Sequence, residues 1–255
     1  MFQPEECFSL LRRYHDASGN YAKFETDVLG VVGFQGMKCP LVAIRIGSGP
    51  KKVLITAGIH GDERAATEAL ARFIESTQTP KFLEEFSVTL LPLLNPAGFS
   101  RNIRKNGSVD LNRHFGCDCS AKENQFVEKY LNGKSFDLMI SLHEDVDMDS
   151  FYMYETGSFD ARRLKHIIDD DVSFLKNVED AGVPLNMERK IYGVLNRGGI
   201  KIVSQLDGKN LEKYLWARDI VKRVVTTETP GKIDFEKRVD IHVLAIRHFL
   251  KSFLV

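Results

Sequence analysis

The chain has 255 residues, of which 43% are hydrophobic and 27% charged, a composition and length that predict one domain with a substantial core over residues 1–255. Lys plus Arg and Asp plus Glu both number 35, so the formal net charge is zero. A neutral chain creates no global field that would attract nucleic acid or an anionic membrane, so we expect a small molecule as partner.

The N-terminal segment MFQPEECFSLLRRYHD carries acidic residues early and has no apolar run long enough for a signal peptide. No later segment approaches the roughly 18 apolar residues of a membrane span. The four cysteines form no CxxC pair and lack the density of a disulfide scaffold, so reduced thiols are expected. A cytoplasmic location is therefore predicted.

Short apolar runs rich in β-branched residues or leucine predict the strands. In chain order these are residues 26–34 and 41–46, which suggest a hairpin, followed by the buried runs 53–57, 88–94, 138–142 and 221–227. Residues 62–75, 122–131 and 236–253 place apolar side chains at helical spacing. The alternation predicts a three-layer α/β/α fold with a mixed, mostly parallel twisted sheet.

A polar cluster follows each of the four buried runs. The clusters are GIHGDE (58–63), NPAGFSRNIRKNG (95–107), HEDVD (143–147) and ETPG (228–231). Ligands of open α/β sheets bind beyond the carboxyl ends of the strands, so these clusters are expected to meet at one site.

His60 and Glu63 stand three positions apart where a strand turns into a helix, so both side chains can point at one metal ion. The best-placed third ligand is His143, directly after the run 138–142. Two histidines and one glutamate with an open fourth position are typical of a catalytic zinc centre. For the other histidines a hydrogen-bonded structural role is the commoner expectation.

The segment 95–113 holds three arginines and several asparagines in a loop. They are Arg101, Asn102, Arg104, Asn106, Asn112 and Arg113. A guanidinium matches a carboxylate in bidentate fashion and can also stabilise an oxyanion, although a solvated basic loop has the same composition.

Glu228 emerges at the end of the run 221–227, just before Pro230 and Gly231. A carboxylate there can accept a proton from a water molecule activated by a metal ion. Glu144, Asp145 and Asp147 of HEDVD either support His143 or face solvent.

These motifs, in this order over roughly residues 50–235, resemble the zinc carboxypeptidase family in the broad sense. That family includes bacterial murein-peptide amidases and, more remotely, succinylglutamate desuccinylase and aspartoacylase. AGIHGDE is similar to the family's HxxE motif and SLHE to the segment with the third ligand. The resemblance implies one Zn²⁺ ion held by His60, Glu63 and His143, with Asp62 not a ligand.

NPAG, Arg104 and DLNRHF resemble the family's NPDG, arginine and NR elements, and TTETP resembles its strand with the catalytic glutamate. The resemblance implies Arg104 as the oxyanion stabiliser, Asn112 and Arg113 as binders of the substrate carboxylate, and Glu228 as the base. The resemblance also suggests Tyr192, in KIYGVLNRGG, as the counterpart of the family's substrate-capping tyrosine, which would bind substrate. It lies in the segment 177–210, which we expect to form an insertion or lid.

The expected activity is that of a zinc metallocarboxypeptidase, which hydrolyses an amide bond next to the free carboxylate of a peptide. An alternative is an N-acyl amino acid deacylase of the succinylglutamate desuccinylase/aspartoacylase type with the same metal and base. A third alternative is a non-catalytic binding module that keeps the fold. The presence of all the ligands, the arginines and the base favours an enzyme.

Overall fold

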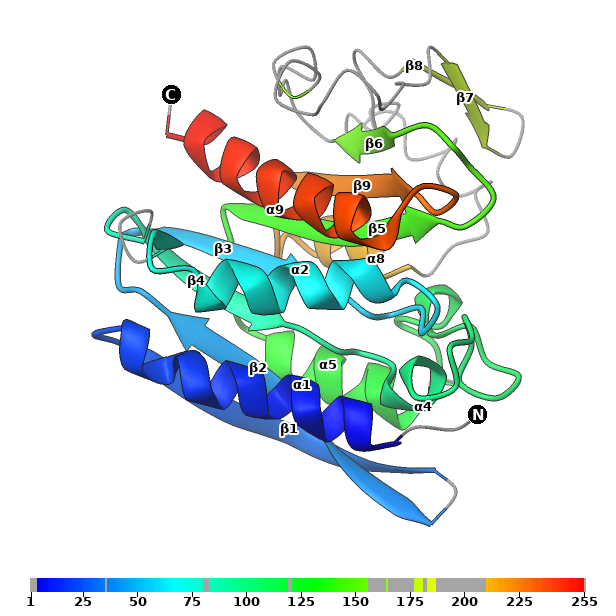
Figure 1. The fold of residues 1–255 in the computed structure, drawn as a ribbon, viewed down its shortest axis with the longest axis horizontal. Coiled ribbons are helices and arrows are strands. Elements are labelled where there is room, and N and C mark those ends of the chain that lie inside the picture. The colour runs from blue at the N-terminus through cyan, green and yellow to red at the C-terminus, as the bar shows by residue number, and fades with distance from the viewer. Residues whose placement is uncertain are drawn as a thin grey trace.

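The structure is a computed structural model, and it describes residues 4–34, 36–79, 83–118, 121–155, 164, 177–180, 183–186 and 210–254. Seven strands form one mixed sheet in the order β1-β2-β4-β3-β5-β9-β6 (Figure 1). Their bounds are β1 Phe24–Phe34, β2 Met37–Ile46, β3 Lys51–Thr56, β4 Phe86–Leu91, β5 Leu138–Asp145, β6 Tyr152–Glu155 and β9 Val224–Pro230. Strands β7 (Asn177–Asp180) and β8 (Val183–Asn186) form a separate antiparallel pair.

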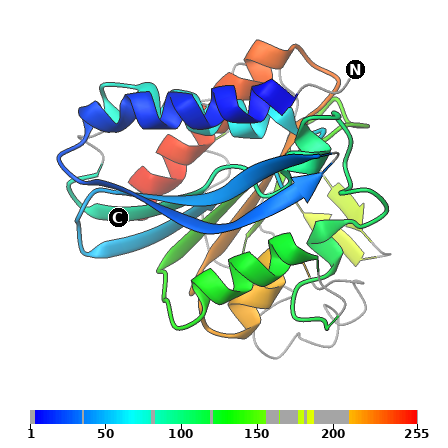
Figure 2. The ribbon, with the colours of Figure 1, turned by 90° about the horizontal axis from the view of Figure 1, so that it is seen from below.

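Helices cover both faces of the sheet. Helices α1 (Pro4–Asp16), α2 (Arg64–Glu75) and α9 (Phe235–Ser252) lie on one face, and α5 (Lys122–Leu131) and α8 (Leu211–Ala217) lie on the other (Figure 2). The short elements are α4 (Pro96–Phe99) and the 3₁₀ helices η1 (Ala17–Asn20) and η2 (Leu111–Arg113). The predicted three-layer α/β/α architecture is confirmed.

The central strands are buried on both faces, as their continuous apolar runs predict. Val53 and Ile55 of β3 pack into the core cluster that α1, α2 and α9 share, whereas Leu54 packs with Met139 and Leu215 on the α8 side. This alternation follows from the two-residue period of a strand. Each fully buried aliphatic side chain of this kind contributes about 1.5–3 kcal/mol to folding.

The four central strands β4, β3, β5 and β9 run parallel, so their carboxyl ends meet at one edge of the sheet. Strands β1 and β2 form the predicted antiparallel hairpin. Strand β4 ends at Leu91, earlier than the apolar run 88–94 suggests. Pro92 explains the difference, because proline has no backbone N–H with which to continue the ladder.

None of the described helices has the length and apolarity needed to cross a bilayer. Cys7 and Cys39 are free and buried. Cys117 is disulfide-bonded, so the expectation of reduced thiols is wrong at that position.

His242 on α9 is completely buried, and its Nδ1 lies 3.4 Å from Thr229 Oγ1. Burial lowers the pKa of His242 from 6.5 to about 3. The folded state therefore resists protonation of a ring that the unfolded chain protonates readily. Above pH 6.5 the ring is neutral in both states and costs the folded state nothing. As the pH falls from 6.5 towards 3, protonation favours the unfolded chain and the free energy of unfolding decreases.

We expect wild-type protein to lose about 2 kcal/mol of unfolding free energy through this histidine alone between pH 7 and pH 5. The His242→Leu variant should lack this component. Urea unfolding of both proteins at the two pH values measures the difference. An equal loss of stability in both proteins would contradict the assignment.

Candidate metal centre

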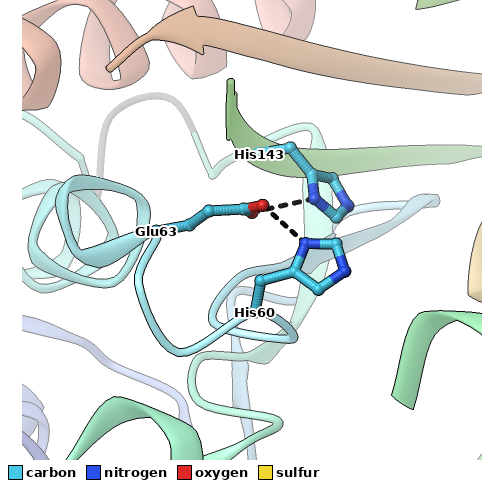
Figure 3. A group of neighbouring side chains, drawn as sticks. All are labelled: His60, Glu63 and His143. Atoms are coloured by element: carbon cyan, nitrogen blue, oxygen red, sulfur yellow. Dashed lines mark hydrogen bonds and ion pairs between the residues drawn. The ribbon is translucent and has the colours of Figure 1, made fainter. Parts of the chain in front are cut away.

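Three buried side chains meet beyond the carboxyl ends of the central strands. His60 lies in the loop after β3, Glu63 immediately precedes α2, and His143 lies near the end of β5. Their exposed fractions are 3%, 2% and 3%. One potential ligand atom of each lies within 4.8 Å of the others, and no other such group is found among the described residues (Figure 3).

The two rings face the Glu63 carboxylate through the same nitrogen. His60 Nδ1 lies 2.5 Å from Glu63 Oε1, and His143 Nδ1 lies 2.9 Å from Glu63 Oε2. Each Nε2 lies against a different carboxylate: His60 Nε2 is 3.3 Å from Asp110 Oδ1, and His143 Nε2 is 3.0 Å from Glu212 Oε1. Donation from Nε2 to these carboxylates leaves both Nδ1 lone pairs turned toward the centre.

The loop carrying His60 has no room for larger residues. Gly58 has a φ of +65°, which suits glycine. A Cβ at Gly61 would lie 2.0 Å from the carbonyl carbon of Gly98 in α4. The loop therefore packs directly against the backbone of the NPAG turn, and this contact fixes the positions from which the His60 and Glu63 side chains project.

Glu144 anchors the helix that follows Glu63. Its Oε1 accepts hydrogen bonds from the backbone N–H groups of Ala65 (2.7 Å) and Ala66 (3.3 Å) at the start of α2, and its Oε2 accepts one from Arg238 of α9. A carboxylate at a helix N-terminus satisfies unpaired N–H groups and interacts favourably with the helix dipole. The Glu144 side chain therefore holds the start of α2, directly after Glu63, and its hydrogen bonds go to α2 and α9.

The charges within the cluster are strongly coupled. Burial raises the pKa of Glu63, but the two histidines outweigh it and hold that pKa far below its usual value. Burial lowers the pKa values of His60 and His143, but Glu63 and the outer carboxylates raise both above 6.5.

The donor set fits zinc. Two imidazole nitrogens and one carboxylate oxygen leave one position open in a tetrahedral centre, as in catalytic rather than structural zinc sites. His60, Glu63 and His143 could hold the ion, and each histidine already has the outer hydrogen bond that fixes a metal-binding ring.

Arg104 lies at the rim of the cluster. Its Nε donates to Asp110 Oδ2 at 3.1 Å, and its Nη1 lies 3.6 Å from Glu63 Oε1, while 41% of the side chain is exposed. Burial lowers the pKa of Arg104, but Glu63 and Asp110 raise it above its ordinary value. The guanidinium therefore stays charged and faces both the cluster and solvent.

Asn112 and Arg113 lie in η2, which the Asp110 side chain caps by accepting from Asn112 N at 3.0 Å. Asn112 is 4% exposed, and its Oδ1 accepts from Leu211 N at 2.9 Å. The NH2 group of the Asn112 side chain is the part that could donate a hydrogen bond to a substrate carboxylate. Arg113 is exposed, with Nη1 donating to Asn112 O at 2.9 Å.

Glu228 lies on β9 in register with His143 on β5 and with Tyr152 on β6. Side chains at paired positions project from the same face of a sheet, so Glu228 stands beside the cluster. Burial, together with Glu63 and Asp145 and against the effect of the two histidines, raises the pKa of Glu228 to about 8. A cation held by the neighbouring ligands would favour the ionised form.

The remaining sequence expectations have different outcomes. Tyr192 and most of the segment 177–210 lie outside the described residues, so that assignment stays a prediction. Asp145 accepts hydrogen bonds from Tyr152 Oη at 2.6 Å and from Asp147 N at 3.1 Å, and neither aspartate joins a metal-binding group among the described residues.

Two carboxylates of the site were not predicted from the sequence. Asp110 is part of the DLNR motif, two positions before Asn112, so the motif itself carried a signal. Glu212 belongs to NLEKY, which matches no motif, and it reaches His143 only through the fold.

Comparison with known proteins supports the resemblance. Residues 49–166 match the model of the succinylglutamate desuccinylase/aspartoacylase catalytic domain, and no curated protein matches the chain. A provisionally named metallopeptidase from Shewanella amazonensis SB2B has a TM-score of 0.76 at 20% identity, with 97% of this chain and 92% of that chain covered.

Two further solved structures share the fold. For a metallo-carboxypeptidase from Burkholderia cenocepacia the TM-score is 0.67 at 14% identity, with 94% of this chain and 67% of that chain covered. For bovine thrombin-activatable fibrinolysis inhibitor the TM-score is 0.67 at 16% identity, with 99% of this chain and 97% of that chain covered. The chain thus has the metallo-carboxypeptidase fold, and the expected similarity to the succinylglutamate desuccinylase/aspartoacylase catalytic domain is confirmed over residues 49–166.

Proposed function

We propose that the protein is a zinc-dependent hydrolase that cuts an amide bond beside the free carboxylate of a peptide. The observation that carries the proposal is the buried cluster of His60, Glu63 and His143, with Glu228 in register beside it and Arg104 at its rim. Candidate metal ligands, a base and an anion-binding group thus stand together at the carboxyl ends of parallel strands, where such folds bind ligands.

His60, Glu63 and His143 would hold a zinc ion, which would supply Lewis acidity and lower the pKa of a water molecule toward about 7. Glu228 accepts a proton from the attacking water and delivers it to the leaving nitrogen, so that one amide and one water give an acid and an amine. Arg104 donates hydrogen bonds to the developing oxyanion. Asn112 and Arg113 bind the neighbouring carboxylate of the substrate.

An N-acyl amino acid deacylase is the second candidate. It is supported by the match of residues 49–166 to the desuccinylase/aspartoacylase catalytic domain, a range that contains His60, Glu63, Arg104 and His143. The peptide substrate is supported by the fold, which metallo-carboxypeptidases share over nearly the whole chain. Both activities need the same metal, base and carboxylate-binding groups, so the substrate pool has to separate them.

Mass spectrometry of the products separates the two activities. Zinc-loaded protein is incubated with one pool of short peptides with free or amidated C-termini and N-succinyl and N-acetyl amino acids. Chelator-sensitive loss of a terminal residue from the free-acid peptides alone is the expected result. Cleavage confined to the acyl amino acids would assign the deacylase activity instead, and no cleavage of any component would contradict both.

The Arg113→Ala variant should lose substrate affinity. A hydrogen bond to a charged group contributes about 1.5–3 kcal/mol, so we expect KM to rise about 10- to 100-fold with little change in kcat. Arg101→Ala is the matched control, because Arg101 lies in the same loop but donates its Nε to Ala97 O. Steady-state kinetics test the prediction, and an equal rise of KM in both variants would point to a general loss of positive charge.

A further inference from the structure

Glu212 contacts His143 from the opposite side to Glu63. Glu212 Oε1 lies 3.0 Å from His143 Nε2, and both side chains are buried, with exposed fractions of 2% and 3%. Glu212 lies in the first turn of α8, on the face of the sheet away from α2 and α9. We propose that Glu212 is the positioning residue that holds the ring of His143 in the orientation and tautomer that bind the metal.

The inference rests on the proposed metal site, and a chain of hydroxyl groups supports it. Ser141 Oγ donates to Glu212 Oε1 at 2.6 Å, and Thr56 Oγ1 donates to Ser141 Oγ at 3.1 Å. Thr56 and Ser141 are paired residues of β3 and β5 and are buried like Glu212. Residues of the sheet itself therefore hold the carboxylate against the ring.

This contact determines which nitrogen of His143 faces the ligand cluster. A carboxylate is only an acceptor, so the proton of the neutral ring is held on Nε2 and the lone pair of Nδ1 points to Glu63. A negatively charged carboxylate that accepts from the outer N–H also makes the ring a stronger ligand. His60 has the analogous partner Asp110 at the longer distance of 3.3 Å, so the shorter contact is the one to His143.

The position of Glu212 also links the metal centre to the loop of Asn112 and Arg113. Asn112 Oδ1 accepts from Leu211 N at 2.9 Å, one residue before Glu212. Asn210 caps the same turn by accepting from Lys213 N at 2.8 Å. The first turn of α8 thus carries the carboxylate behind His143 and also fixes the loop proposed to bind the substrate carboxylate.

The test measures metal binding directly, independently of activity. Zn²⁺ affinity is determined by competition with a chromophoric chelator, and the Co²⁺-loaded proteins are compared by their visible absorption spectra. The Glu212→Ala variant should bind Zn²⁺ about 10- to 100-fold more weakly, with an altered Co²⁺ spectrum. Glu212→Gln, which keeps the shape and one acceptor oxygen, should fall between Glu212→Ala and wild type.

Glu123→Gln is the matched control, because Glu123 is a buried acid that accepts from Asn106 Nδ2 and contacts none of the three ligands. It should keep wild-type affinity and spectrum. Wild-type affinity and spectrum in Glu212→Ala would overturn the inference. If that variant does not fold, Glu212→Gln decides, and unchanged affinity there overturns it equally. Failure of wild-type protein to bind Zn²⁺ would instead contradict the metal site and the proposed function.

Discussion

Replacement of Glu228 by glutamine is expected to abolish hydrolysis while zinc binding stays intact. The glutamine amide keeps the size of the side chain but cannot accept a proton from water. General acid–base catalysis contributes about 10²- to 10⁴-fold to a rate, so kcat should fall by at least that range. Glu228 is on β9 and is not one of the three ligands, which come from the β3–α2 loop and from β5, so the metal should remain.

The measurement pairs kcat with zinc content after dialysis. Asp147→Asn is the control, because Asp147 is an exposed acid of the turn after β5 and should retain wild-type kcat. Full activity of Glu228→Gln would rule out the base assignment. Loss of zinc together with activity would show instead that Glu228 supports the metal.

The His143→Ala variant is expected to lose the metal and the activity together. Removal of the His143 imidazole leaves one imidazole and one carboxylate as ligands. The buried Glu212 carboxylate also loses the ring that it contacts. Loss of an outer hydrogen-bond partner alone typically lowers metal affinity about 10- to 100-fold, so loss of a ligand should exceed that range. Zinc titration of the variant provides the measurement.

His242→Leu is the control for this experiment, because it removes another completely buried histidine that is not part of the ligand cluster. It should bind zinc as wild type does. Zinc affinity of His143→Ala within a few fold of wild type would eliminate His143 as a ligand.

The fold was largely predictable because its central strands are continuous apolar runs separated by amphipathic helices. The pattern identified β3, β4, β5 and β9, but it did not indicate α8. This helix has only seven residues, and its two buried leucines, Leu211 and Leu215, are too few to establish a helical periodicity. Strand β6 was also missed, since Tyr152–Glu155 is only four residues long. Short elements take their structure from the sheet that they join.

The residues of the candidate site likewise divide into those that the sequence predicts and those that only the fold brings together. His60 and Glu63 are close in sequence, so a turn of backbone suffices to predict that they meet. Glu144 illustrates the opposite case: it follows His143 directly, yet successive residues of a strand point to opposite faces of the sheet. His143 therefore meets Glu212 on α8, whereas Glu144 reaches α2 and Arg238 of α9. Glu212 could not be predicted, because 69 residues separate it from His143.

The separation of the ligands along the chain determines when the ion can enter during folding. Glu63 and His143 are 80 positions apart, and they meet only once β3 and β5 have paired in register. A chain that has not yet formed this pairing offers an ion only His60 and Glu63. A metal ion held by these three ligands would therefore bind a site that the sheet has already built. The order is the reverse of that in small zinc-nucleated domains, where the ion itself organises an otherwise unfolded chain.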